Sequence, residues 1–256
     1  MFWALATGAI DPRGFEFEVV LREIQVLNEW ALEARLDVTA ISLHAYPLVQ
    51  DKYMLLPHGA SMGSAQGPVV LSPEPLSRAE LREVEIAVPG RMTTAFLVLE
   101  LYLGGEFPCR EVPFDEILAE VKSGRAPAGL LAHEGQLTYG TQGLTKSIDL
   151  GEWWLLETGL PLPLGVNVAR RELGEERLRE LSAVLRESIE AGLAKRHDAM
   201  AYALRQARAR DHFAATSAGD YTCDYGDEGR EAVRELLERA EATGVYERPV
   251  RVEFVS

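Results

Sequence analysis

The chain has 256 residues, 47% of them hydrophobic, so it is long enough for one large domain or two small ones. Its formal net charge is −14, and no cluster of lysine and arginine interrupts the acidic background, which argues against nucleic acid as a partner. Cys109 and Cys223 lie far apart without a CxxC partner, which excludes a disulfide scaffold and a zinc ribbon. We therefore expect an ordinary globular protein with free thiols in a reducing compartment, the cytoplasm.

The start of the chain is apolar but does not resemble a targeting signal. Residues 1–8 lack the basic region of a secretory signal peptide, and no later run approaches the ~20 apolar residues of a membrane span. We therefore expect no membrane partner. The pattern instead predicts the end of a buried helix over residues 1–7, closed by Gly8.

The first part of the chain has the pattern of a strand and helix unit followed by further strands. Alternation of apolar and charged residues predicts a strand at 15–21, and helical spacing predicts a helix at 24–36. Residues 38–43 are mostly apolar at both odd and even positions, so both faces of the strand would be apolar. This pattern is typical of a strand buried on both faces of a parallel sheet. A flexible glycine-rich loop is expected at 57–67, followed by a strand at 68–71.

Beyond a proline-containing linker at 73–75, strands and helices alternate, which predicts a parallel sheet with helices between its strands. The expected strands are 84–88, 110–113, 128–132, 144–150 and 164–169, and the expected helices are 93–103, 114–123, 175–213 and 228–244. We therefore predict an α/β protein with a discontinuous first lobe, residues 1–72 and 166–256, and an inserted second lobe, residues 73–165.

Three segments are predicted to follow the carboxyl ends of strands, where ligands of open α/β sheets bind: His44, residues 89–94 and His133. Thr93 and Thr94 begin an apolar helix. They can cap that helix, and the same geometry favours a carboxylate, because free N–H groups and the positive end of the helix dipole attract an anion. His133 is either satisfied by local hydrogen bonds or acts as a general base, with the hydroxyls of Thr138 and Tyr139 nearby in sequence.

Two short motifs suggest other chemistry but lack its context. Residues 59–63 match GxSxG, which would make Ser61 a hydrolase nucleophile, but a strand is expected after them where a nucleophile elbow needs a helix. His133 and Glu134 begin like the zinc motif HExxH, but position 137 is leucine, so no metal site is expected.

Several longer motifs together resemble one family, the 1,4-dihydroxy-6-naphthoate synthases, over essentially the whole chain. They are LNEWALE at 27–33, VPGRMTTA at 88–95, His133-Glu134 with Thr138-Tyr139, DLGEWW at 149–154 and TGLPLPLG at 158–165. The resemblance implies a two-lobed fold similar to the type II periplasmic solute-binding proteins. In that fold each lobe has a mostly parallel sheet with flanking helices, and the ligand cleft lies between the lobes.

The resemblance also implies an activity and its residues. The family members are carbon–carbon lyases of menaquinone biosynthesis by the futalosine pathway. They convert cyclic dehypoxanthinyl futalosine to 1,4-dihydroxy-6-naphthoate with loss of dihydroxyacetone. The implied substrate-binding residues are Ala40, Ile41, Ser42, Thr93 and Thr94. The implied proton acceptor is His133, with no cofactor or metal, a small-molecule carboxylate as partner, and a monomer or homodimer as the assembly.

Two other functions fit the same fold, and the sequence differs from the family pattern at two places. A chorismate dehydratase of the same pathway, or a non-catalytic solute-binding protein, would have the same fold. Family members can carry lysine at the position of Ala40. Alanine at this position lacks the positive charge that would contact the substrate. Family members also begin with a strand and a Ser-Pro-Cys-Pro-Asn-Asp-Thr-like loop ahead of the first helix. We therefore expect the first lobe to lack a strand.

Overall fold

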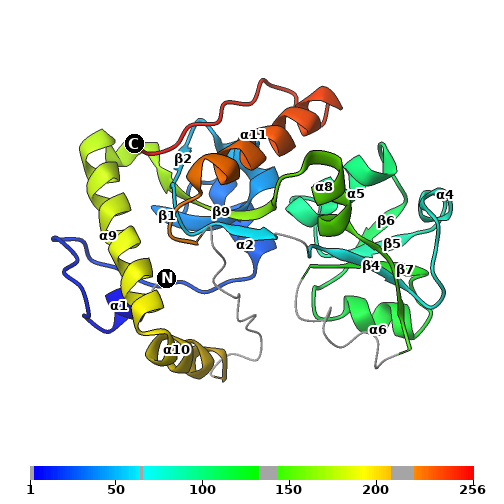
Figure 1. The fold of residues 1–256 in the computed structure, drawn as a ribbon, viewed down its shortest axis with the longest axis horizontal. Helices are drawn as coiled ribbons and strands as arrows, with labels where there is room; N and C mark the ends of the chain where they lie inside the picture. Colours follow the sequence, from blue (N-terminus) through cyan, green and yellow to red (C-terminus); the bar gives the residue numbers. More distant parts are fainter. Residues whose placement is uncertain (1–2, 64–65, 133–142, 209–221) are drawn as a thin grey trace.

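The computed structural model describes residues 3–63, 66–132, 143–208 and 222–256. Its strands form two sheets flanked by helices (Figure 1). The helices are α1 (Trp3–Ala6), α2 (Ile24–Leu32), α3 (Tyr46–Val49), α4 (Arg78–Leu81), α5 (Thr94–Leu103), α6 (Ile117–Lys122), α8 (Leu150–Thr158), α9 (Glu175–Ala194), α10 (Arg196–Arg208) and α11 (Gly226–Ala242), with a short 3-10 turn η1 (Leu43–Ala45).

The first sheet is organised around the long strand β9 (Leu162–Arg170). β1 (Val38–Ser42), β2 (Tyr53–Leu55) and β3 (Ser61–Gly63) all pair with β9, and all three pairings are antiparallel. The prediction of a mostly parallel sheet is therefore wrong for this lobe. Apolar residues on both faces of β1 predicted an enclosed strand, although Ala40 is exposed. The pattern carried no information on direction, which is set by β9 returning from the second sheet and running between β1 and β2.

The second sheet is mixed. β6 (Cys109–Glu111), β5 (Ile86–Val88) and β7 (Ala128–Leu131) are parallel neighbours, as the alternation of strands and helices predicted. Next to β7 the order continues with β4 (Val69–Ser72) and β8 (Thr145–Asp149), and these pairings are antiparallel. The sheet thus combines a parallel half with an antiparallel edge.

The changes between the sheets do not fall where the sequence pattern placed them. The strand β4 was predicted to close the first lobe at residue 72, but it pairs within the second sheet. The chain changes sheets between Gly63 and Val69, and it returns to the first sheet at Leu162 rather than at residue 166. The prolines at 73–75 therefore form a turn that follows β4, and not the linker between the lobes.

The segment at residues 15–21, predicted as a strand, has no regular secondary structure and pairs with no described strand. Phe15 and Phe17 pack against the buried side chains under α9, and the guanidinium of Arg177 lies 4.0 Å from the centre of the Phe15 ring. The alternation of apolar side chains therefore reflects packing on a helix. The helix predicted at the start of the chain is confirmed over Trp3–Ala6, and Gly8 follows it with a φ of 68°.

One hydrophobic core joins the two sheets, and α5 lies at its centre. The core includes Ile41 and Val166 of the first sheet together with Val88 of the second. α5 is apolar on nearly all sides because it contacts β9, η1 and α11 of the first lobe as well as β7 and α4 of the second. α5 is therefore held by both lobes.

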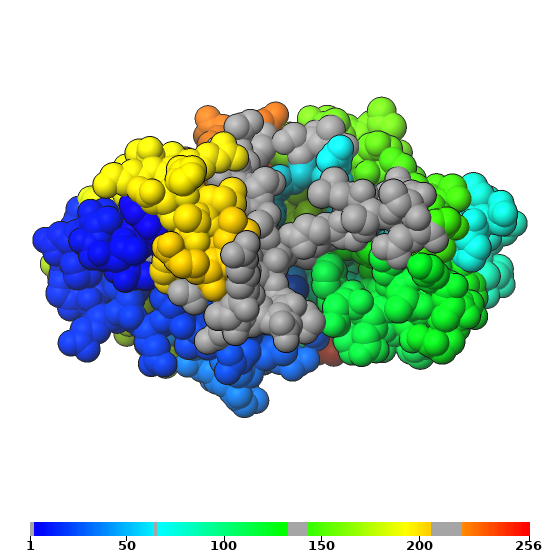
Figure 2. Space-filling view, turned by 90° about the horizontal axis from the view of Figure 1, so that it is seen from below, coloured from blue at the N-terminus to red at the C-terminus, as the bar shows by residue number. Residues whose placement is uncertain are grey.

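The two-part arrangement is also visible from a second direction. In Figure 2 the early residues and the α9–α10 region, blue and yellow, gather on one side, and residues of the second sheet, cyan to green, gather on the other. No helix within the described ranges is long and apolar enough to span a bilayer.

Candidate active site at the junction of the lobes

The two predicted threonines begin α5 and have different partners. The Thr93 side chain accepts a hydrogen bond from the Phe96 N–H at 3.2 Å and donates to the Gly90 carbonyl at 2.8 Å, so its predicted role as an N-cap is confirmed. The Thr94 hydroxyl instead donates to the Leu164 carbonyl at 2.6 Å. Because Leu164 belongs to β9, Thr94 joins the second lobe to the first.

The first turn of α5 retains free hydrogen-bond donors. Within the described part of the chain, the backbone N–H groups of Thr94 and Ala95 have no acceptor. Both residues are buried, at the positive end of a helix of 10 residues. Such a pair of N–H groups is suited to bind a carboxylate, because the helix dipole favours negative charge at this position.

The predicted binding segment Ala40, Ile41 and Ser42 forms most of β1, and its side chains alternate. Ile41 is fully buried in the core, so only its backbone remains for a ligand. Ala40 and Ser42 share the other face, with Ala40 exposed and Ser42 4% exposed. Of the three side chains, only that of Ser42 combines a polar group with a place at the carboxyl end of the strand.

A residue that the sequence analysis did not single out, Asn28 of α2, connects Ser42 to the threonine turn, defined here as residues 90–94. The Asn28 amide oxygen accepts from the Ser42 N–H at 2.8 Å, and its NH₂ group donates to the Ser42 hydroxyl at 3.1 Å and to the Met92 carbonyl at 3.3 Å. Asn28 is fully buried. The signal available in the sequence was a polar residue between Leu27 and Ala31 on the apolar face of a helix.

His44 lies in η1, directly after β1, as predicted, and it also contacts the threonine turn. Its backbone N–H donates to the Thr94 hydroxyl at 3.2 Å, and its Nδ1 lies 2.9 Å from the Tyr246 hydroxyl. Burial lowers the pKa of His44 from 6.5 to about 4, and a backbone hydrogen bond with Arg91 partly opposes that shift. The imidazole is therefore neutral at neutral pH and a weak proton acceptor.

The predicted base, His133, lies outside the described residues, as do Thr138 and Tyr139. β7 ends at Leu131, and the description resumes at Gly143. The structure therefore brings together Ser42, Thr93, Thr94 and His44 at the junction of the lobes, and the role of His133 stays a prediction.

The alternative nucleophile, Ser61, does not have the geometry of a hydrolase elbow. It is the first residue of β3 and pairs with Gly165 of β9. A nucleophile elbow would place the serine in a sharp turn between a strand and a helix. The expectation of an unpaired loop over residues 57–67 is corrected at the same time, because Ser61–Gly63 is a strand.

The chain resembles proteins of known name over its whole length. It is 40% identical to the 1,4-dihydroxy-6-naphthoate synthase of Thermus thermophilus over 263 residues, covering 100% of this chain and 94% of the relative. It is 36% identical to the enzyme of the same name from Streptomyces coelicolor over 255 residues, covering 96% of this chain and 89% of the relative.

Solved structures agree with this resemblance. A crystal structure of a protein from Archaeoglobus fulgidus superposes with a TM-score of 0.86 at 41% identity, covering 96% of this chain and 93% of that one. The periplasmic aliphatic sulphonate binding protein of Escherichia coli matches with a TM-score of 0.63 at 13% identity, covering 98% and 85% of the two chains, so it shares the fold alone. The predicted two-lobed fold similar to that of periplasmic solute-binding proteins is thus confirmed.

A family profile described as menaquinone biosynthesis matches residues 1–242. Together with full-length relatives at 36–40% identity, this match settles the family of the protein. The chain belongs to the menaquinone biosynthesis family.

Proposed function

We propose that this chain is a 1,4-dihydroxy-6-naphthoate synthase, a carbon–carbon lyase that converts cyclic dehypoxanthinyl futalosine to 1,4-dihydroxy-6-naphthoate with loss of dihydroxyacetone. The observation that carries the proposal is 40% identity to a synthase of that name over 100% of the chain. The motifs at 88–95 and 158–165 support it, because they form the amino end of α5 and the start of β9.

The geometry at the junction of the lobes supports a role in binding the substrate carboxylate. The free N–H groups of Thr94 and Ala95 offer an anion site on the second lobe. The Ser42 hydroxyl, held by Asn28, offers a polar group on the first lobe. A ligand between these groups would contact both lobes at once.

We propose His133 as the proton acceptor that starts the reaction. An ordinary histidine, with a pKa near 6.5, can take a proton at neutral pH and begin a retro-aldol-like cleavage that aromatisation draws forward. The buried His44, whose pKa is lowered to about 4, suits this task less well. Amino-acid side chains alone can catalyse proton transfer and bond cleavage of this kind. We propose that the protein acts in the cytoplasm on a small-molecule carboxylate, as a monomer or homodimer.

Two other functions fit the same fold. A chorismate dehydratase would act on a different acid of the same pathway, and a solute-binding protein would hold its ligand unchanged. The receptor alternative has only a fold likeness at 13% identity behind it, and that likeness gives no information on activity.

Incubation of the purified protein with cyclic dehypoxanthinyl futalosine, and separately with chorismate, distinguishes the three functions by the mass of the product. We expect 1,4-dihydroxy-6-naphthoate and dihydroxyacetone from the first substrate and no reaction with the second. Loss of water from chorismate would identify a dehydratase. Binding of a substrate that is recovered unchanged would identify a receptor.

A further inference from the structure

The hydroxyl of Tyr246 is the buried partner of the His44 ring. Tyr246 is 9% exposed and follows α11, which ends at Ala242. Its hydroxyl lies 2.9 Å from Nδ1 of His44 and 3.3 Å from the His44 carbonyl oxygen, and the two ring centres are 5.6 Å apart. The phenol therefore contacts both the ring and the backbone of one residue.

His44 in turn contacts the threonine turn. Its N–H donates to the Thr94 hydroxyl at 3.2 Å. Asn28 supports the same turn independently, through the Met92 carbonyl. The threonine turn is thus held from the first lobe at Thr94, by His44 and Leu164, and at Met92, by Asn28.

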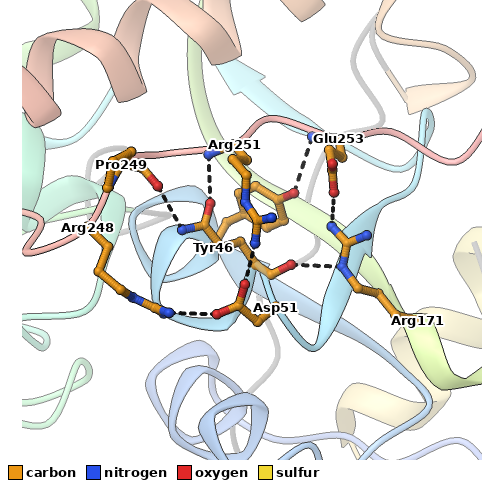
Figure 3. A network of polar contacts seen from close by, with 8 residues as sticks. Tyr46, Asp51, Arg171, Arg248, Pro249, Arg251 and Glu253 are labelled. Atoms are coloured by element: carbon orange, nitrogen blue, oxygen red, sulfur yellow. Dashed lines mark hydrogen bonds and ion pairs between the residues drawn. The ribbon is translucent and has the colours of Figure 1, made fainter.

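The segment that carries Tyr246 is itself fixed to the first lobe. Residues 246–255, here the C-terminal segment, run along β2: the Leu55 N–H donates to the Glu253 carbonyl at 2.9 Å, and the Val255 N–H donates to the Leu55 carbonyl at 2.8 Å. Further contacts in Figure 3 bind the segment to the chain around Tyr46. They are Arg248–Asp51, Arg251–Asp51, Gln50–Pro249, Gln50–Arg251, Tyr46–Glu253 and Arg171–Glu253.

We propose that Tyr246 is a positioning residue: its hydroxyl holds His44, and His44 holds the threonine turn in the geometry that binds the substrate carboxylate. The proposal builds on the proposed function, because the turn matters only if it binds substrate. Tyr246 lies beyond residues 1–242, the part matched by the family profile. The C-terminal segment thereby supports a site whose described binding groups, Ser42, Thr94 and Ala95, lie far earlier in the chain.

The test is Tyr246→Phe, which removes only the hydroxyl. We expect KM to rise about five- to tenfold, the effect of losing one buried hydrogen bond, while kcat changes less than about twofold. KM should respond more than kcat, because the turn binds the same carboxylate in the ground state and the transition state.

The matched control is Tyr46→Phe. Tyr46 is a fully buried tyrosine whose hydroxyl accepts from the Glu253 N–H at 3.3 Å, so it anchors the same segment away from the threonine turn. This variant should lose stability but keep KM within about twofold of the wild type. Equal increases in KM for both variants would overturn the proposal, since they would reflect general loosening of the segment.

Substitution of His44 is the second part of the test. His44→Asn keeps a polar atom near the Nδ1 position and should largely retain the wild-type KM, whereas His44→Leu should raise it as Tyr246→Phe does. In the double variant His44→Leu/Tyr246→Phe the two effects should not add, because both changes break the same link. Additive effects would mean that Tyr246 acts through another residue, contrary to the proposal.

Hydrogen exchange separates failure of this proposal from failure of the proposed function. Amides of residues 90–97 should exchange faster in Tyr246→Phe than in the wild type or in Tyr46→Phe, whether or not the protein is active. An inactive wild type with this exchange pattern would reject the activity and keep the structural link. Unchanged exchange together with an unchanged KM in Tyr246→Phe would reject the positioning role.

Discussion

His44 is enclosed by protein on nearly all sides, at 8% exposure, and its Nδ1 lies 2.9 Å from the Tyr246 hydroxyl. The enclosure disfavours the charged form, and among the described residues no carboxylate forms a hydrogen bond or ion pair with His44 to compensate. A histidine in this setting contributes hydrogen bonds rather than proton transfer. We therefore propose His133, rather than His44, as the proton acceptor.

The two histidines should therefore differ when each is replaced by asparagine. His133→Asn should lower kcat by at least about 100-fold with little change in KM, because a positioned general base contributes ~10²–10⁴-fold. His44→Asn should leave kcat close to the wild-type value. Steady-state kinetics on properly folded variants decides this. Retention of more than about a tenth of kcat by His133→Asn would mean that the base is another residue.

The low pKa of His44 also makes stability depend on pH. Between pH 6.5 and about 4 the unfolded chain binds a proton at this position and the folded protein does not, so stability falls as the pH falls. From pH 7.5 to pH 5 the wild type should lose about 2 kcal/mol more than His44→Asn, by 1.36 kcal/mol per unit of pH below 6.5. Urea unfolding at both values measures this. Equal losses in the two proteins would show that His44 does not titrate in this way.

At the scale of single residues, the sequence predicted the polar side chains at the ends of strands and helices. It did not predict the residues that form hydrogen bonds with them. Thr93, Thr94 and Ser42 follow from local pattern and from the family motif. The partners that fix them are distant in sequence: Asn28 reaches Met92 across 64 positions and Tyr246 reaches His44 across 202. Periodicity describes which side of an element is buried, and it contains no information about such pairings.

At the scale of elements, positions were predicted better than strand directions. β1, β5, β7 and α5 lie where the patterns placed them, because buried apolar runs and helix caps are local features. The antiparallel pairing of β9 and the place of β4 in the second sheet depend on how the chain crosses between lobes. The strand predicted at residues 15–21 was wrong, because alternation fits any extended segment with one buried side.

The two segments that cross between the sheets, residues 63–69 and 149–162, meet at a close contact between two glycines. The Asp149 carboxylate, which caps α8, accepts hydrogen bonds from the N–H groups of Gly67 and Gly151 at 3.0 and 2.9 Å. A Cβ at Gly151 would lie 2.4 Å from the Gly67 nitrogen. Both positions therefore require glycine for space, because backbone atoms at this contact cannot move aside.

Gly151→Ala should lower the free energy of unfolding by about 1–3 kcal/mol, as overpacking against rigid neighbours does. Gly192→Ala in α9 is the matched control. A Cβ there would meet nothing within 4 Å, so alanine should raise stability by up to about 1 kcal/mol through helix propensity. Chemical denaturation of both variants tests the pair. A stable Gly151→Ala would mean that the backbone at residues 66–67 can shift.

At the scale of the whole molecule, the shared core makes two sheets into one cooperative unit. α5 is buried by both lobes, and the same hydrophobic cluster contains side chains of each sheet. Separate unfolding of one lobe would expose α5 to water. The two-lobed form is therefore an arrangement of sheets and not a pair of independent domains.

Calorimetry should accordingly show a single unfolding transition, with equal calorimetric and van't Hoff enthalpies. Leu97→Ala, at a fully buried position of α5, should lower the stability of that one transition by about 2–5 kcal/mol without splitting it. Two resolved transitions, or a shift of only one of them, would show that the lobes unfold independently.

The central position of β9 has a consequence for the order in which the chain is made. Within the described residues, the ladder pairings of β1, β2 and β3 are all to β9, which begins at Leu162. The strands of the second sheet, from Val69 to Asp149, are complete before β9 leaves the ribosome. The first lobe is thus begun first and completed last. The edges of β1, β2 and β3 stay unpaired while roughly one hundred further residues are synthesised, at ~5–20 residues per second. During that interval the second lobe, although inserted in the first, is the one able to assemble.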